Sequence, residues 1–337
     1  MKKLFILLTL VTVLILPSCD SDTEPGVVVD FADEKLEELI RDYTNKDEGD
    51  IYSSDLEKIT SLQPSAFETS TKIENLTGLE YCTNLKKLDL NNQDIRDLSP
   101  LSSLTGLTEL ILYSNEIRDI SPLANLTDLK HLNLSKNHIR DISSLASLEK
   151  LDWLSISWNT VNDISPLNSL KNLVNLSATH LYINDVSPLT SLEKCTNLKV
   201  GGNGLTDISP LSTMKQLKKL TIVSSPLTNI SAIAYLANLE YINLVGNQIV
   251  DVSPLSSLDG LTELKLGENG ISNLSPLIGL DSLHSLHLSD NQITDISPLL
   301  HLKRLKYLSI KDNPLSDKSI QEYIPQLEKN RVEVNWR

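Results

Sequence analysis

Acidic side chains at a fixed spacing are the first candidates for chemistry in this chain of 337 residues. One column of aspartates recurs at multiples of 22 residues and comprises Asp97, Asp119, Asp141, Asp163, Asp185, Asp207, Asp251 and Asp295. Carboxylates stacked about 4.8 Å apart could form a ladder of calcium ligands. A short Asp side chain at a bend also accepts hydrogen bonds from nearby backbone donors. We favour this second interpretation and predict no metal site.

Motifs for catalysis are missing from the sequence. The six histidines show no metal-ligand spacing with cysteine, and no nucleophile elbow, phosphate loop or dinucleotide fingerprint occurs. The run from Gly201 to Gly204 is interpreted as a turn, not as a phosphate cradle. We therefore predict that the protein is not an enzyme and uses no cofactor. A formal net charge of −14 also argues against a nucleic-acid partner, because such binding depends on clustered Lys and Arg.

An apolar pattern with a period of 22 residues organises most of the chain. Its anchor position is apolar without interruption from Ile95 to Leu315, which gives eleven units in phase. The residues five, seven and ten positions before each anchor are also apolar. One such unit cannot bury its apolar face alone, but stacked units share a continuous core. The sequence therefore predicts a solenoid.

Each unit is predicted to hold a short strand, a turn and a short helical segment. Asn stands two residues before the anchor in eight units, where its amide can satisfy backbone groups that point inward. Leu181 breaks this column, so we expect a local irregularity there. The second half of a unit reads Asp-Ile-Ser-Pro-Leu or close to it. We expect the Ser to cap a helical turn and the Pro to occupy its first position.

This repeat resembles the leucine-rich repeat, specifically the 22-residue bacterial class found in internalins. The resemblance covers residues 84–315 and implies an α/β solenoid of horseshoe shape. Parallel strands would line its concave face and short 3-10 or helical turns its convex face. The resemblance also implies that the concave face binds a partner. We see neither an immunoglobulin-like domain nor a cell-wall sorting tail after the repeats.

Caps are expected at both ends, because an open solenoid exposes its core there. Residues 31–83 are predicted to form an N-terminal cap with a degenerate repeat, including a helix over 33–43. Ser54 and Glu57 are expected to form a capping box for a second helix. Residues 316–337 are predicted to form the C-terminal cap, with a helix that starts at Ser316 and a closing strand over 331–336.

The N-terminus carries a targeting pattern. Lys2 and Lys3 precede an apolar run over 4–16 that is too short to span a bilayer. The sequence Leu-Pro-Ser-Cys that ends at Cys19 resembles the lipobox of bacterial lipoproteins. The resemblance implies that residues 1–18 are a signal peptide and that Cys19 carries the lipid; the alternative is an ordinary signal with a chance cysteine. The acidic segment 19–30 is interpreted as a flexible tether.

Location follows from this pattern as an expectation. A lipid anchor would hold the protein on the bacterial outer membrane without crossing it. We favour display on the cell surface, and the periplasmic face is the alternative. The remaining cysteines, Cys82 and Cys195, lie about five repeats apart, or roughly 24 Å at one strand spacing per repeat. They are too far apart for a disulfide, and both are predicted to be small buried core residues.

The candidate binding residues lie on the predicted concave face. Strand alternation exposes the residues eight, six and four positions before each anchor, and large rings occur in or next to those columns. The ligand-binding candidates are Tyr113, His131, Trp153, Trp158, His180, Tyr241 and Tyr307. Exposed aromatic side chains typically dominate interface energetics, although packing against neighbouring strands is the alternative role. We predict that Tyr113, His131, Trp153 and Trp158 form one cluster.

Basic side chains accompany the rings on or near the same face, which favours an acidic partner. They are Lys87, Lys130, Lys199, Lys218, Lys219 and Lys265. We predict a monomeric, membrane-anchored binding module with a protein partner, or a glycan. The alternative is a structural envelope protein that packs against a partner lipoprotein without a soluble ligand.

Overall fold

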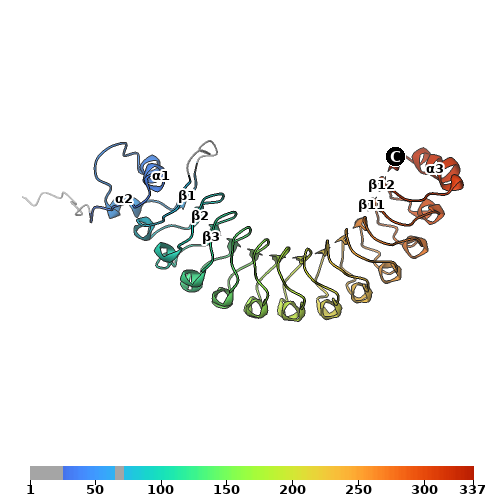
Figure 1. The fold of residues 1–337 in the computed structure, drawn as a ribbon, viewed down its shortest axis with the longest axis horizontal. Helices are drawn as coiled ribbons and strands as arrows, with labels where there is room; N and C mark the ends of the chain where they lie inside the picture. Colours follow the sequence, from blue (N-terminus) through green and yellow to red (C-terminus); the bar gives the residue numbers. More distant parts are fainter. Residues whose placement is uncertain (1–25, 65–71) are drawn as a thin grey trace, which may run out of the picture.

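Thirteen parallel strands form one curved sheet (Figure 1). This computed structural model describes residues 26–64 and 72–337, so Cys19, the predicted signal peptide and most of the predicted tether lie outside the described residues. Neighbouring strands follow the chain order from β1 to β13. The strands line the inside of the arc, and short turns follow its outside (Figure 1). The predicted α/β solenoid is confirmed.

The elements of the repeats are short and regular. The strands are β1 (Ser61–Leu62), β2 (Lys87–Asp89), β3 (Glu109–Ile111), β4 (His131–Asn133), β5 (Trp153–Ser155), β6 (Asn175–Ser177), β7 (Asn197–Lys199), β8 (Lys219–Thr221), β9 (Tyr241–Asn243), β10 (Glu263–Lys265), β11 (Ser285–His287), β12 (Tyr307–Ser309) and β13 (Glu333–Asn335). The 3-10 turns are η1 (Leu79–Tyr81), η2 (Ser99–Leu101), η3 (Ser121–Asn125), η4 (Ser143–Ser147), η5 (Ser165–Ser169), η6 (Ser187–Ser191), η7 (Ser209–Thr213), η8 (Ser231–Tyr235), η9 (Ser253–Leu255), η10 (Ser275–Leu277) and η11 (Ser297–His301).

Strand register reproduces the sequence period. Leu110 of β3 pairs with Leu132 of β4, an offset of 22 residues that continues through the repeats. At the N-terminal end Ser61 pairs with Lys87, an offset of 26 residues, and the β12–β13 pair has the same longer offset. Each three-residue repeat strand has its central apolar residue buried, because alternate side chains point to opposite faces. The flanking side chains are left for the concave face.

The core consists of the apolar columns, which are buried from one unit to the next. Cys82 and Cys195 belong to this core and are fully buried free thiols. Burial raises the pKa of each thiol to about 12, because the thiolate loses its hydration. The prediction of two small, unpaired core cysteines is confirmed.

A ladder of buried asparagine amides connects successive units. Asn137 is typical: its Oδ1 accepts the Ile117 N–H at 3.0 Å, and its Nδ2 donates to Leu112 O at 2.9 Å and to Leu134 O at 3.0 Å. The bonds to Ile117 and Leu112 reach the preceding unit, and all three satisfy backbone groups that water cannot reach. The predicted amide ladder is confirmed.

The ladder is irregular at the position predicted from Leu181. Leu181 has no amide, so the Val161 N–H lacks the acceptor that this position has in regular units. In regular units the Asn Oδ1 accepts the N–H of the residue 20 positions earlier. Asn203 Oδ1 accepts the Leu181 N–H at 2.9 Å in place of the Ile183 N–H. A separate irregularity lies three units further along, where Asn247 Oδ1 is buried without a hydrogen-bond partner in the described part of the chain.

The aspartate column caps the convex turns. The Ser121 N–H donates to Asp119 Oδ1 at 2.8 Å, and the Ser121 hydroxyl donates to Asp119 Oδ2 at 2.9 Å. The backbone bond recurs at all eight aspartates. The capping interpretation is confirmed, but the expected role of the Ser is wrong. Its hydroxyl donates to the carboxylate, and the accepting cap is the Asp two residues earlier.

One column of left-handed residues was not foreseen. The residue three positions before each anchor has a φ between +50° and +71°. The members are Asn92, Ser114, Lys136, Trp158, His180, Gly202, Ser224, Gly246, Glu268, Asp290 and Asp312. This conformation costs roughly 1 kcal/mol or more for a residue with a Cβ. The chain accepts that cost because each strand must turn sharply at the same point.

The N-terminal cap contains two helices, α1 (Glu34–Thr44) and α2 (Ser53–Leu56). The Asp33 carboxylate caps α1 by accepting the N–H groups of Lys35 and Leu36. The expected Ser54–Glu57 capping box is wrong: Asp55 accepts the Tyr52 N–H at 3.1 Å, so the second helix starts two residues earlier. Within the described ranges, no helix combines the length and hydrophobicity that a membrane span requires.

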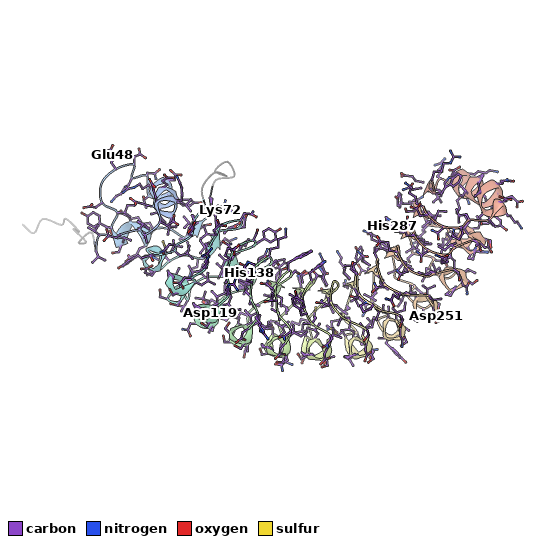
Figure 2. All side chains as sticks on the ribbon, in the orientation of Figure 1. Glu48, Lys72, Asp119, His138, Asp251 and His287 are labelled. Carbon is purple, nitrogen blue, oxygen red and sulfur yellow. The ribbon has the colours of Figure 1, made fainter. Side chains whose placement is uncertain are left out.

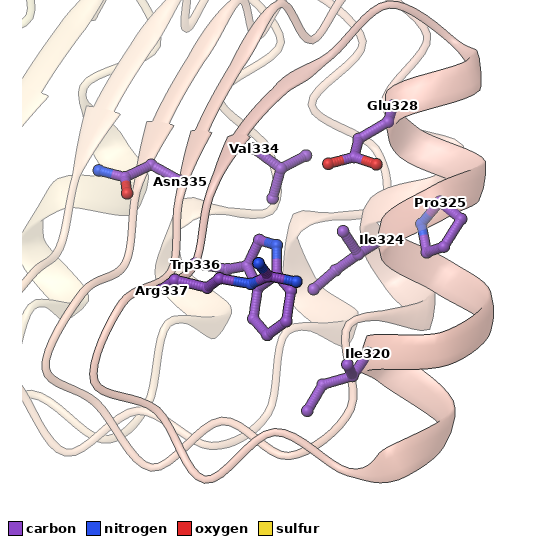
Figure 3. A pocket seen from close by; sticks show the side chains of 8 residues that line it. All are labelled: Ile320, Ile324, Pro325, Glu328, Val334, Asn335, Trp336 and Arg337. Carbon is purple, nitrogen blue, oxygen red and sulfur yellow. The ribbon is translucent and has the colours of Figure 1, made fainter.

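The C-terminal cap covers the last repeat with a π-helical segment, η12 (Ser319–Tyr323), and α3 (Ile324–Lys329). The Ser316 hydroxyl accepts the Ser319 N–H at 3.2 Å, as expected for a helix start. Strand β13 then pairs with β12 as the predicted closing strand. A cavity of about 450 Å³ lies between this strand and the helices. Figure 3 shows the side chains that line it, among them Ile320, Ile324 and Trp336.

Candidate functional site

The concave wall is built from the two outer residues of each strand. In β4, for example, His131 and Asn133 flank the buried Leu132 and are both half-buried. Because neighbouring strands pair in register, residues of one column lie side by side on adjacent strands. Figure 2 places His287 toward the inside of the arc, and Asp119 and Asp251 toward its outside. The rings therefore sit on the opposite side of the solenoid from the capping aspartates.

His131 and Trp153 form a stacked pair on β4 and β5. Their ring centroids are 4.1 Å apart and their planes differ by 5°. The two residues are direct register partners, so the strand spacing of about 4.8 Å already favours face-to-face contact. Both side chains are half-buried. The pair is a preformed flat surface on the concave wall.

Trp158 and His180 form a second stacked pair at the edge of the strands. Both residues belong to the left-handed column, and their ring centroids are 3.7 Å apart with planes that differ by 8°. The His180 ring lies over Gly202, where an added Cβ would come within 2.8 Å of it. Trp158 remains 52% exposed. Within the described residues, His180 Nδ1 is buried without a hydrogen-bond partner.

Ring contacts among the described residues join the candidates of the first half into two stacked pairs, His131 with Trp153 and Trp158 with His180. Trp153 lies in β5, whereas Trp158 lies beyond the end of that strand, in the left-handed column. The Tyr113 ring receives the Lys136 ammonium, 5.1 Å from its centroid. The cluster of Tyr113, His131, Trp153 and Trp158 stays a prediction. The structure has one pair on the wall and one pair at its edge, because five positions separate their columns.

The candidates of the second half lie far along the arc from the first pair. The Lys265 ammonium lies 5.5 Å from the centroid of the Tyr241 ring, and Tyr307 packs against His287 with centroids 5.0 Å apart. A hydrogen bond with Glu263 is the main cause that raises the pKa of Lys265. Burial, helped by the Lys265 charge, lowers the pKa of His287.

A pocket of about 400 Å³ opens on the concave wall across β7 to β10. Its lining residues are Asn197, Lys199, Lys219, Thr221, Tyr241, Asn243 and Glu263. Of these, the sequence predicted Lys199 and Lys219 as basic residues of the concave face and Tyr241 as a binding residue, but it did not place the three in one pocket. The signal was available, because these residues occupy the same two concave columns on consecutive units. In the described part of the chain, no group of three or more His, Cys, Asp and Glu residues is placed to hold a metal ion.

The fold and its concave wall define the class, which is the leucine-rich repeat solenoid. The family described as Leucine Rich repeats (2 copies) matches residues 105–147, 237–279 and 281–323. The crystal structure of an internalin (inlF) from Listeria monocytogenes is 32% identical in sequence, with a TM-score of 0.77. That match covers 90% of this chain and 95% of the internalin chain. The chain therefore belongs to the internalin family.

More distant structures share the fold alone. A leucine-rich repeat protein of Leptospira interrogans is 19% identical with a TM-score of 0.51, and the match covers 84% of this chain and 97% of that one. The plant peptide hormone receptor RGFR1, solved in complex with RGF2, is 20% identical with a TM-score of 0.55. The match covers 85% of this chain and 58% of the receptor chain. The comparison with curated proteins gives no match.

Proposed function

We propose that this chain is a recognition protein that binds a protein partner on the concave face of its solenoid. The His131–Trp153 pair carries the proposal, because two stacked rings stand on an otherwise largely polar wall. The rings are already held in place by each other and by the sheet. A partner that packs on them would therefore lose little additional side-chain freedom on binding. The internalin family and the repeat fold support a protein-interaction module.

The proposal assigns no catalysis, cofactor or nucleic-acid partner to the chain. The candidate residues are rings and lysines spread along an open wall, without an activated nucleophile beside a base. The formal net charge of −14 opposes a phosphate backbone. We propose that the protein acts as a monomer, since a single solenoid presents the whole concave wall.

We also propose that the protein is held on the bacterial outer membrane by a lipid on Cys19, with the solenoid displayed at the cell surface. The support is the Leu-Pro-Ser-Cys sequence and the acidic segment that follows it. A Cys19→Ser variant should move from the membrane fraction to the soluble fraction. Protease added to intact cells should digest the wild-type protein. Full protection from protease would instead place it on the periplasmic face.

Binding is tested with substitutions that remove one ring pair at a time. A partner is first isolated from envelope and host-cell extracts with the full chain, and its Kd is then measured by biolayer interferometry. The double variant His131→Ala, Trp153→Ala should bind about 30-fold more weakly, or about 2 kcal/mol, as expected for an interface hot spot. Tyr235→Ala is the matched control, because Tyr235 is 61% exposed on the convex turn η8.

The outcomes separate recognition from other roles. Retained affinity in the His131→Ala, Trp153→Ala variant, with unchanged thermal unfolding, contradicts the proposed site. Cross-linking in intact cells to one stoichiometric envelope protein, with no loss in that variant, favours the structural alternative. Binding only to immobilised glycans contradicts the protein partner.

A further inference from the structure

The pocket across β7 to β10 is formed by two adjacent rows of polar side chains on the concave face of the sheet. Strand register places Asn197, Lys219, Tyr241 and Glu263 in one row and Lys199, Thr221, Asn243 and Lys265 in the next. Buried residues such as Leu198 and Leu220 separate the rows within each strand. Lys199 and Lys219 are therefore diagonal neighbours on adjacent strands, and both are exposed.

These two lysines lack the acidic partners that other concave lysines have. Lys87 pairs with Glu109 at 2.8 Å, and Lys265 pairs with Glu263 at 2.9 Å. Across residues 26–64 and 72–337, the side chain of neither Lys199 nor Lys219 takes part in an ion pair or hydrogen bond. Two uncompensated positive charges thus face one pocket in a chain whose net charge is −14.

A neutral donor of fixed orientation completes the pocket. Asn243 Oδ1 accepts the Val245 N–H at 3.2 Å, which assigns the oxygen and leaves the Nδ2 hydrogens as donors. Among the described residues, Nδ2 of Asn243 donates to no acceptor. The pocket therefore offers an amide donor and the Thr221 hydroxyl beside two ammonium groups.

We propose that this basic pocket, lined by Lys199, Lys219, Thr221 and Asn243, receives a carboxylate side chain from an acidic, extended segment of the protein partner. The inference rests on the proposed use of the concave face for binding. Separate ammonium and amide donors suit a singly charged carboxylate. These donors also bind phosphate, so the neighbouring charge decides between the two anions. The nearby Glu263 would also repel a doubly charged phosphate more strongly than a carboxylate.

The distance to the aromatic pair defines the spacing in the partner. Trp153 on β5 and Lys219 on β8 are separated by three strand spacings, or about 14 Å at about 4.8 Å each. A segment that crosses the strands in extended form advances about 3.4 Å per residue. The partner should therefore carry an aromatic or apolar residue and an acidic residue about four positions apart.

The pocket is tested with a defined probe and a charge-matched control. Fluorescein-labelled tetraglutamate is titrated with the full chain in detergent at low ionic strength, and fluorescence anisotropy is measured. The double variant Lys199→Gln, Lys219→Gln should weaken binding about tenfold. The double variant Lys303→Gln, Lys329→Gln removes the same charge from exposed positions outside the pocket, so it should change affinity less than threefold.

Three results would overturn the inference. They are equal weakening in both double variants, equal binding of tetraglutamine, and displacement of the probe by inorganic phosphate at a lower concentration than by free glutamate. Failure here is distinguishable from failure of the proposed function. If the isolated partner still depends on Trp153 but not on Lys199 and Lys219, the acidic subsite is wrong and the concave face remains the binding site.

Discussion

Substitution of Asn137 by Ala should destabilise the solenoid by about 3 kcal/mol. The side chain is 5% exposed and makes three close hydrogen bonds, at 3.0 Å to Ile117 N, 2.9 Å to Leu112 O and 3.0 Å to Leu134 O. Each such bond contributes about 1 kcal/mol net, and a buried backbone group that loses its partner cannot recover it from water. The three bonds together give the expected magnitude.

The measurement is equilibrium unfolding in urea, followed by far-ultraviolet circular dichroism and by Trp fluorescence. The two probes must give coincident transitions, and the slope of the unfolding free energy against urea concentration must be the same in variant and wild type, because long repeat arrays can lose cooperativity. Asn168→Ala is the matched control, since Asn168 is exposed on η5 and its side chain makes no hydrogen bond in the described structure. Its effect should stay within about 0.5 kcal/mol. A loss below about 1 kcal/mol for Asn137→Ala would refute the role assigned to the amide ladder.

Three further predictions concern the core, the convex turns and the strand edge. In a Cys19→Ser chain, Cys82 and Cys195 should resist alkylation at pH 8 while folded and react fully in guanidinium, because burial raises their pKa to about 12; rapid native labelling argues against the packing. The hydrogen bond from the backbone amide two residues later lowers the pKa of Asp141. Its stabilising effect is present above the unfolded pKa of about 3.9 and is lost as pH falls through the lower folded value. Asp141→Ala should therefore flatten the fall in urea midpoint between neutral pH and about pH 3, and an unchanged profile counts against the cap. Gly201→Ala should destabilise by about 1–3 kcal/mol, because its Cβ would clash with the backbone nitrogen of Val223 in the next repeat; urea unfolding measures this, and a neutral effect rejects the close approach.

The repeat architecture could be predicted because one period fixes strand, turn and core together. Every unit has apolar residues at the same offsets, and only one in-register stack buries them all. The Asn and Asp columns were predictable for the same reason, since the period brings the same backbone groups beside each side chain, largely from the preceding unit for Asn and within the turn for Asp. The error at the Ser before Pro arose because both side chains are competent caps, and only the geometry of the turn decides which one accepts.

The arrangement of the rings could not be predicted from the columns alone. Trp158 and His180 adopt left-handed backbone that residues with a Cβ seldom adopt, because the turn shared by all units overrides local preference. That conformation places their stack at the edge of the strands, apart from His131 and Trp153. The lack of ion pairs at Lys199 and Lys219 was also hidden, since it depends on which neighbouring acids are already paired.

Recognition by the concave wall is tested most directly by site-specific photo-cross-linking in the presence of the isolated partner. A benzophenone amino acid replaces Trp153 on the concave wall in one variant and Tyr235 on the convex turn in another. Both positions already carry a large aromatic ring. We predict strong cross-linking to the partner from position 153 and little from position 235. Cross-linking from 235 without cross-linking from 153 would contradict the binding face.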